Sequence, residues 1–456
     1  MEKKYSILAK QTEQFKKYFR TINPDKLKAQ SEYKAVMAFR AAVKNSPAYA
    51  DFIKKSTGID PRRVNKIQHF KEFVPILDKD KVFGAYSGKI ESWCKGTNLD
   101  NVGEIVSSSG HSGKFSFGIN SRSSQKYSRQ LTDIMLDYTF GISRKKTLLI
   151  NTLAMGIRIS SDYVTVADTG PRTDTVIALL KEFAPKFEQV IVAADNNFIK
   201  NTLEEARESH VDTKDVKIHL ILGEEILAEN LRSYLASLLY EDLDNPDGAF
   251  IGSSFGIAEL GLNLLFETRQ SIRLRRVTQK DNQFSAPPAI FQYLPTRAYL
   301  EEYESKESGT ELLMTNLDDS ALLPLVRYNT KENAKLIASP KGELPLNLPF
   351  ITVYGRDKLI AKDGLVIRPE LIKEALFLNC DVASSVTGYF RISQTDGVLN
   401  IDVQLKKGKD NLSQIRDNIQ SSFSYFLKFP HIVNVHPYYS FPFGLELDYE
   451  RKFRYI

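Results

Sequence analysis

The segment LLINTLAM at residues 148–155 opens a run in which apolar strands alternate with amphipathic helices. Two further apolar runs follow, VIVAAD at 190–195 and VKIHLILG at 216–223. Helical patterns lie beside them, TDTVIALLKEFA at 173–184 and EEILAENLRSYLASLLY at 224–240. This alternation is typical of an α/β domain with a mostly parallel sheet, because the connecting helices cover both faces of such a sheet.

The pattern changes on both sides of this run. Residues 1–95 are mainly helical, whereas short strands with turns prevail after about residue 285. The last hundred residues give a helix, two strands, a second helix and a strand, the order of a small βαββαβ-like α+β domain. We therefore predict a large α/β domain at 1–354, with 1–95 as a helical lead-in, and a small mobile domain at 355–456.

Length, net charge and cysteine count limit the kinds of protein that this chain could be. The chain has 456 residues, enough for two or three domains. Its 62 basic and 56 acidic residues leave a net charge of +6, which suits a polyanionic small molecule; the absence of a long basic stripe argues against nucleic acid. The two cysteines, Cys94 and Cys380, are too few for a four-cysteine zinc site. Few cysteines, no signal peptide and no apolar run of ~20 residues predict a cytoplasmic protein outside the membrane.

A loop of small residues, SSSGHSGK at 107–114, has the chemistry of a phosphate site. Glycines allow close backbone approach, hydroxyls and N–H groups donate to phosphate oxygens, and Lys114 adds positive charge. It is not a Walker A loop, which needs glycine in place of Ser108 and serine or threonine in place of Phe115. A flexible surface loop has the same composition, so this segment alone leaves both interpretations open.

Four further segments carry groups that suit a nucleotide. In SFGIAE at 254–259, an aromatic ring could cover a purine and a carboxylate could hold Mg²⁺. The others are LVRYNTKE at 325–332, YGRDK at 354–358 and ERKFR at 450–454. Taken singly, each also fits an ordinary turn or a solvated tail.

In order and spacing, the five segments together resemble the adenylate-forming superfamily of acyl- and aryl-CoA synthetases, most nearly its phenylacetate–coenzyme A ligase branch. The family's Ser/Thr-Ser-Gly-Thr-Thr-Gly-Lys loop matches residues 108–114, and its aromatic-Gly-x-Thr/Ser-Glu motif matches 255–259. Its Pro-Leu-Ile-Arg-Tyr-Arg-Thr-Gly-Asp motif matches 324–332, and its Gly-Arg and terminal Gly-Lys motifs match 355–356 and 451–452. Similar short segments at 46–49, 74–77 and 222–225 extend the resemblance over nearly the whole chain.

The resemblance implies an acid–thiol ligase that uses ATP and Mg²⁺ to convert a small carboxylic acid to acyl-AMP and then transfers the acyl group to coenzyme A. The implied catalytic residues are Lys452, at the carboxylate and α-phosphate, and Glu259, the Mg²⁺ ligand. The implied ATP- and AMP-binding residues are Ser108, Ser109, Gly110, Ser112, Gly113, Lys114, Gly223, Glu224, Phe255, Gly256, Glu332 and Arg356. The small domain would turn about a hinge at Asp357 and Lys358 between the two half-reactions.

The sequence predicts only the general class of the acid substrate. Frequent Phe and Tyr favour an aromatic or medium acyl acid, and the predicted pocket residues are Leu153, Met155, Gly156, Ile157, Tyr163 and Ser254. Ordinary core packing would explain the same apolar residues.

Departures from the family pattern keep alternatives open. Ala258 replaces a hydroxyl residue, Lys331 replaces glycine, Glu332 replaces aspartate and Arg451 replaces glycine. The acyl acceptor could instead be a carrier protein, a protein side chain or an amine. A nucleotide-binding module without turnover is the alternative from another class, and the sequence leaves a homodimer open.

Overall fold

The computed structural model describes residues 2–85, 88–97, 99–108, 110, 115–211, 214–281, 286–305, 309–339, 344–356, 358–360, 366–409, 412–447 and 452–456, without the side chains of 2, 3, 280 and 281. Within these ranges, no helix is both long and apolar enough to cross a membrane.

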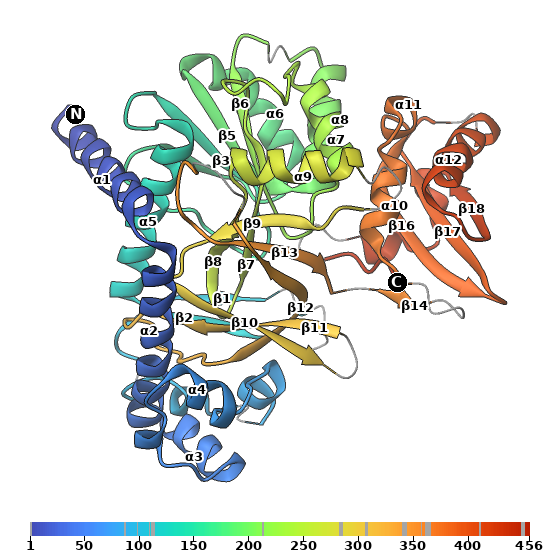
Figure 1. Cartoon of the computed structure of the whole chain (residues 1–456). Helices are drawn as coiled ribbons and strands as arrows, with labels where there is room; N and C mark the ends of the chain where they lie inside the picture. The colour runs from blue at the N-terminus through green and yellow to red at the C-terminus, as the bar shows by residue number, and fades with distance from the viewer. Residues whose placement is uncertain are drawn as a thin grey trace.

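Helices form the lead-in, as expected. They are α1 (Glu2–Thr21), α2 (Pro24–Asn45), α3 (Pro47–Ser56) and α4 (Ile67–Phe73), at the left and lower left of Figure 1. Sequence signals fix two of their starts: the Asn23 side chain accepts from the first-turn amides of α2, and Ser46 does the same for α3. Proline follows each cap at the first helical position, where its missing N–H costs nothing.

One eleven-stranded sheet forms the body of the large part, in the order β10-β11-β12-β13-β9-β8-β7-β6-β5-β3-β4. Its parallel section confirms the predicted α/β fold and contains β3 (Thr147–Asn151), β4 (Thr165–Asp168), β5 (Gln189–Asp195), β6 (Lys217–Gly223) and β7 (Ile251–Ile257). The sheet continues antiparallel through β8 (Gly261–Phe266), β9 (Ala289–Tyr293), β10 (Ala298–Ser305), β11 (Gly309–Asn316), β12 (Tyr328–Ile337) and β13 (Phe350–Gly355). A separate hairpin joins β1 (Val102–Ser107) to β2 (Phe117–Ser121).

Helices cover both faces of the parallel section. Leu149, Ile191 and Ile221 pack with α5 (Arg122–Phe140) on one face. The alternate residues Leu148 and Val190 pack with the helices of the other face, as the period of two in a strand requires. Those helices are α6 (Thr173–Glu182), α7 (Asn196–Glu208) and α8 (Glu229–Leu238), and α9 (Arg269–Asp281) follows β8.

The C-terminal residues form a smaller α+β unit at the right of Figure 1. It contains β14 (Leu359–Ile360), β15 (Val366–Ile367), α10 (Pro369–Leu376), α11 (Cys380–Ala383), β16 (Val386–Thr395), β17 (Val398–Leu405), α12 (Leu412–Phe426) and β18 (His431–His436). Its sheet, β16-β17-β18, is separate from the large one. Leu231 and Leu235 of α8 nevertheless share a hydrophobic cluster with Ile372 and Leu376 of α10, so the two parts are packed together.

Candidate active site

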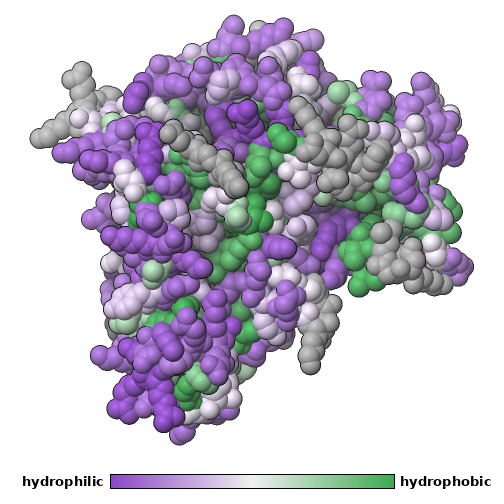
Figure 2. Space-filling model, in the orientation of Figure 1, coloured by the Kyte–Doolittle hydropathy of each residue, from purple (hydrophilic) through white to green (hydrophobic). Residues whose placement is uncertain are grey.

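A cavity of about 920 Å³ opens at the carboxyl ends of the parallel strands, where ligands of open α/β sheets usually bind. Its wall combines residues from both parts of the chain, including Pro369, Lys373 and Lys452 of the smaller unit. On the face seen in Figure 2, hydrophobic residues form a band near the centre and further groups at the right and lower left, with hydrophilic residues around them.

The predicted phosphate loop joins β1 to β2 at the wall of this cavity. Ser108 pairs with Ser116 across the base of the loop: its amide donates to the Ser116 carbonyl, and its hydroxyl accepts from the Ser116 amide, both at 2.9 Å. Gly110 has φ +67°, and a Cβ there would lie 2.9 Å from the Phe115 ring. Ser109, Ser112, Gly113 and Lys114 lie outside the described residues.

Glu259 lies at the turn between β7 and β8, facing the base of the loop. Ser116 Oγ donates to its Oε2 at 3.0 Å, and the Tyr328 hydroxyl donates to its Oε1. Burial, followed by the charge of Glu259, raises the pKa of Tyr328, so the phenol remains a donor. A Cβ on Gly118 would lie 2.1 Å from the Ala258 carbonyl oxygen, so glycine lets β2 approach this turn closely.

Lys79 is a cavity residue that the motifs did not predict. Its Nζ lies 3.4 Å from Ser108 Oγ. Burial lowers the pKa of Lys79; Glu259 opposes this shift, and Arg356 adds to it. The only sequence signal would have been its position two residues after the 74–77 segment, and a bridge between Leu77 and Tyr328 brings it to the cavity.

The predicted ribose pair is formed. Arg356 Nε donates to Glu332 Oε1 at 2.6 Å, and Glu332 is the main cause of the raised pKa of Arg356. Lys331, which stands where the family has glycine, adopts a left-handed φ of +61°. The backbone thus keeps the conformation that favours glycine although the side chain differs.

The predicted adenine wall also lines the cavity, and it contains a strained residue. Gly223, Glu224, Phe255 and Gly256 all reach the wall. A Cβ on Gly256 would lie 3.0 Å from the Leu262 backbone. Glu224 has φ +69°, and its Oε1 has no hydrogen-bond partner among the described residues. Burial is the main cause of the raised pKa of Glu224, and Lys452 counteracts it, which places the Lys452 charge near this carboxylate.

The C-terminal segment that carries Lys452 is anchored. Phe453 and Tyr455 on either side of Arg454 are buried. The Tyr455 hydroxyl accepts from Asn197 Nδ2 at 3.1 Å and donates to Glu225 Oε2 at 3.2 Å. These contacts hold the segment against the large part, so Lys452 is not on a frayed tail.

Of the predicted acid-pocket residues, Leu153, Met155, Ile157 and Ser254 line the cavity. Tyr163 and Gly156 are not among the residues that line it. Tyr163 packs against Tyr5 of α1, with ring centroids 5.9 Å apart, a tertiary contact that residue type cannot reveal. Instead, the apolar wall continues into residues that the sequence analysis did not name, Met135, Leu136, Phe140, Leu149, Ile221 and Phe250.

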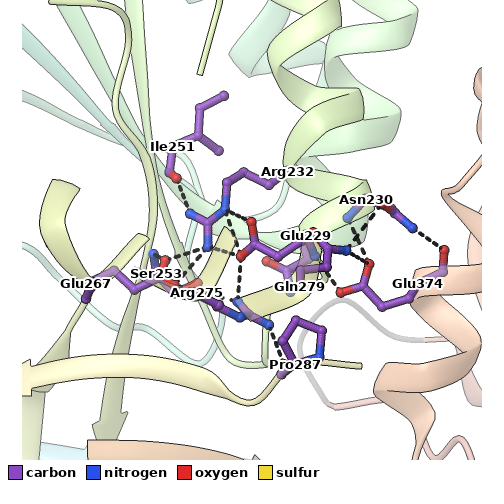
Figure 3. Close-up of polar contacts among 12 residues, drawn as sticks. Glu229, Asn230, Arg232, Ile251, Ser253, Glu267, Arg275, Gln279, Pro287 and Glu374 are labelled. Carbon is purple, nitrogen blue, oxygen red and sulfur yellow. Dashed lines mark hydrogen bonds and ion pairs between the residues drawn. The ribbon is translucent and has the colours of Figure 1, made fainter. Parts of the chain in front are cut away.

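A buried network of charges braces the strand behind the adenine wall (Figure 3). Arg232 Nη2 lies 2.8 Å from both Glu229 Oε1 and Glu267 Oε1, and Arg275 Nη1 lies 3.0 Å from Glu229 Oε1. Glu267 Oε2 accepts from the Ser253 amide of β7 at 2.7 Å. Lys358, one of the two predicted hinge residues, directly precedes β14, and the other, Asp357, lies outside the described residues.

Among the described residues, Glu259 is the carboxylate that could bind Mg²⁺ in the cavity. They contain no cluster of three His, Cys, Asp or Glu side chains, but Mg²⁺ usually takes only one or two carboxylates together with substrate phosphates. Glu259, in the cavity wall beside the loop, fits that pattern.

Comparisons with known proteins identify the fold. Neither a scan against protein-family models nor a search of curated proteins finds a match. Among solved structures, 2-hydroxyisobutyryl-CoA ligase in the postadenylation state with R3-HIB-AMP has a TM-score of 0.68 at 13% identity, covering 92% of this chain and 87% of that one. The same ligase with 2-HIB-AMP and CoA in the thioesterification state gives 0.58 at 14%, covering 93% and 89%. Anthranilate CoA ligase AuaEII with anthranoyl-AMP gives 0.50 at 12%, covering 74% and 63%.

These likenesses confirm the predicted two-part fold and the resemblance to adenylate-forming enzymes at the level of fold. They do not distinguish the phenylacetate–coenzyme A ligase branch, which stays a prediction.

Proposed function

We propose that the protein is an AMP-forming ligase that activates a carboxylic acid with ATP and transfers the acyl group to coenzyme A. The observation that carries this proposal is the convergence of five separated segments on one cavity, represented by Ser108, Glu259, Glu332, Arg356 and Lys452. These are the five segments on which the resemblance in sequence rests, and each contributes at least one residue to the cavity wall.

In the first half-reaction, a carboxylate oxygen of the acid attacks the α-phosphorus, the bond to the β-phosphate breaks, and pyrophosphate leaves. Positioning and charge stabilisation are the main tasks of the protein. Ser108 and Lys79 border the phosphates, the Glu332–Arg356 pair holds the ribose, and Lys452 meets the charge that develops at the α-phosphate. Bound Mg²⁺ would be held by Glu259 and would neutralise phosphate charge.

In the second half-reaction, the thiolate of coenzyme A attacks the acyl carbonyl carbon and AMP leaves. Lys373, Lys452 and Tyr455 of the smaller unit line the cavity in the present arrangement. We propose that this unit turns about 357–358 to withdraw Lys452 and admit the thiol. The apolar wall from Met135 to Phe250 supports an acid with an aromatic or medium apolar body.

ATP–pyrophosphate exchange over a panel of carboxylic acids tests the first half-reaction. Exchange that depends on one class of acid is expected, and thioester formation with coenzyme A should follow with the same acid. Exchange without a thioester would redirect the proposal to a carrier protein, a side chain or an amine as acceptor. If ATP binds but no acid supports exchange, the module without turnover, towards which Ala258 points, replaces the proposal.

A further inference from the structure

Arg297 is a cation at the cavity wall with few partners. It lies in the turn between β9 and β10. Among the described residues, the one hydrogen bond of its guanidinium runs from Nη1 to the Asn263 carbonyl at 3.4 Å. Within the described ranges, no carboxylate lies within ion-pair distance of its guanidinium, which carries five N–H donors. Burial lowers the pKa of Arg297, and the negative charge of Asp318 opposes only part of that shift.

Asp318 is the carboxylate that raises the pKa of Arg297, and both of its oxygens already accept hydrogen bonds from other residues. Asp318 Oδ2 accepts from Ser124 Oγ at 2.5 Å, and its Oδ1 accepts from the Ser320 amide at 2.9 Å. Asp318 therefore holds the first turn of α5 in place. Arg297 is partly buried and its guanidinium has N–H donors to spare, so this position of the cavity wall can receive an anion.

Two contacts connect Arg297 to the predicted acid pocket. Ser254 Oγ donates to Asn263 Oδ1 at 2.9 Å, and the carbonyl of Asn263 meets Arg297. Arg297 Nη2 also lies 3.2 Å from where a Cβ on Gly261 would stand. The neutral side chains of Asn120 and Asn316 share this cavity wall.

Arg297 lies beside the β8 residue that contacts the predicted acid pocket. Its Nη1 donates to the carbonyl of Asn263, and the side chain of the same Asn263 accepts from Ser254. The Arg297 guanidinium therefore borders the Ser254 side of the cavity wall.

We propose that Arg297 binds a second carboxylate on the acid substrate, which makes the substrate a dicarboxylic acid. This inference rests on the proposed ligase function. A guanidinium matches a carboxylate by two parallel N–H···O bonds, and a single guanidinium suits a single negative charge. Asp318 and Glu104 in the same wall would repel a more highly charged group such as phosphate.

The test compares dicarboxylates of three to eight carbons with their monoamides, using calorimetric binding to ATP-free protein. The wild type should bind one dicarboxylate about 10- to 10²-fold more tightly than its monoamide, as expected for hydrogen bonds to a charged group. Arg297→Met should abolish that preference and Arg297→Lys should restore part of it. Arg416→Met, at an exposed position, is the control for a lost charge, and the thermal midpoints verify folding.

Equal binding of each dicarboxylate and its monoamide by the wild type would overturn the inference, as would a preference that survives in Arg297→Met. Binding of inorganic phosphate that depends on Arg297, without dicarboxylate binding, would also overturn it. Exchange assays separate the two proposals. Exchange driven by monocarboxylates and insensitive to Arg297→Met would leave the ligase function standing and remove the Arg297 assignment, whereas Arg297-dependent binding without any exchange would reject the ligase function.

Discussion

Glu374, in α10 of the smaller unit, caps a helix that begins at Glu229 of the large part. Its Oε1 accepts from the Glu229 amide at 2.7 Å, and its Oε2 accepts from the Asn230 amide at 2.9 Å (Figure 3). The N-cap residue of α8 is Ala228, which has no side-chain acceptor, so the cap comes from the other part of the chain. Without the Glu374 carboxylate, the first-turn amides of Glu229 and Asn230 would have no hydrogen-bond acceptor.

Glu374→Ala should therefore weaken docking of the smaller unit in the arrangement that places Lys452 in the cavity. An unsatisfied buried amide costs about 1–3 kcal/mol, so acyl-AMP formation should fall by about 10-fold or more. Conversion of supplied acyl-AMP to thioester should change less, because that step does not need this arrangement. Separate assays of the two half-reactions measure the effect, with Glu205→Ala on the exposed face of α7 as control. An equal loss in both half-reactions would reduce Glu374 to a role in general stability.

Glu259→Gln keeps the shape of the side chain but removes its charge. In the variant one of the Ser116 and Tyr328 hydroxyls keeps an oxygen to donate to, and the other can rotate to accept from the amide NH2, so the fold should persist. Loss of a charged Mg²⁺ ligand should lower ATP–pyrophosphate exchange by about 10²-fold and raise the Mg²⁺ concentration needed for half-maximal rate. Exchange with an unchanged Mg²⁺ requirement would remove Glu259 from the metal site.

Lys79→Met removes the cation beside Ser108 while keeping an extended apolar side chain. One charge-assisted contact to phosphate contributes about 1.5–3 kcal/mol, so the KM for ATP should rise by about 10- to 10²-fold. Lys81→Met provides a matched control, because Lys81 lies on the same segment but pairs with Asp78. A similar KM change in both variants would show that the whole segment, rather than the Lys79 charge, was disturbed.

The contrast between Lys79 and Glu259 shows what the sequence could predict. Glu259 belongs to a motif, and the parallel strands around it follow from local apolar runs, so both were accessible to pattern analysis. Lys79 and Arg297 are single basic residues in unremarkable contexts, and only long-range pairing brings them to the cavity. The antiparallel strands β10 to β13 join the same sheet through equally distant pairings. The contact of Tyr163 with Tyr5 is of the same kind, because the two residues are 158 positions apart in sequence.

The junction between the two parts predicts a pH effect. Burial raises the pKa of Glu370 to about 7 and also raises the pKa of Glu224, and each carboxylate has an oxygen without a hydrogen bond to any described residue. The charge of Lys373 lowers the pKa of Glu370, and the charge of Lys452 lowers that of Glu224. The charge of Glu225 raises both pKa values, and Asp195 also raises that of Glu224. Since both pKa values are raised in the docked form, that form binds protons more tightly than the undocked or unfolded form does.

Docking and stability should therefore be greatest below about pH 5 for these two groups and should decline as the pH rises through about 7. The thermal midpoint measured from pH 5 to 9 should show the Glu370 contribution as a decline between pH 5 and about 7 that levels off at higher pH. Glu370→Gln, a neutral isostere beside Gly355, should flatten the curve, whereas Glu205→Gln should leave it unchanged. A curve with the same slope in Glu370→Gln and the wild type would exclude Glu370 as the titrating group.

Lys452→Ala gives the sharpest separation of the two half-reactions. Phe453 and Tyr455 anchor the segment, so truncation at 452 should leave the docked arrangement intact. A cation that meets charge developing in the transition state is worth on the order of 10²–10³-fold in rate. Acyl-AMP formation should fall by that factor. Thioester formation from supplied acyl-AMP and the affinity for ATP should change little, because the Glu332–Arg356 pair proposed to bind the ribose is untouched. Arg454→Ala, two residues away, is the control for a lost charge at this end of the chain. Equal loss in both half-reactions would make Lys452 structural, and full activity in both would show that the terminal motif match is accidental.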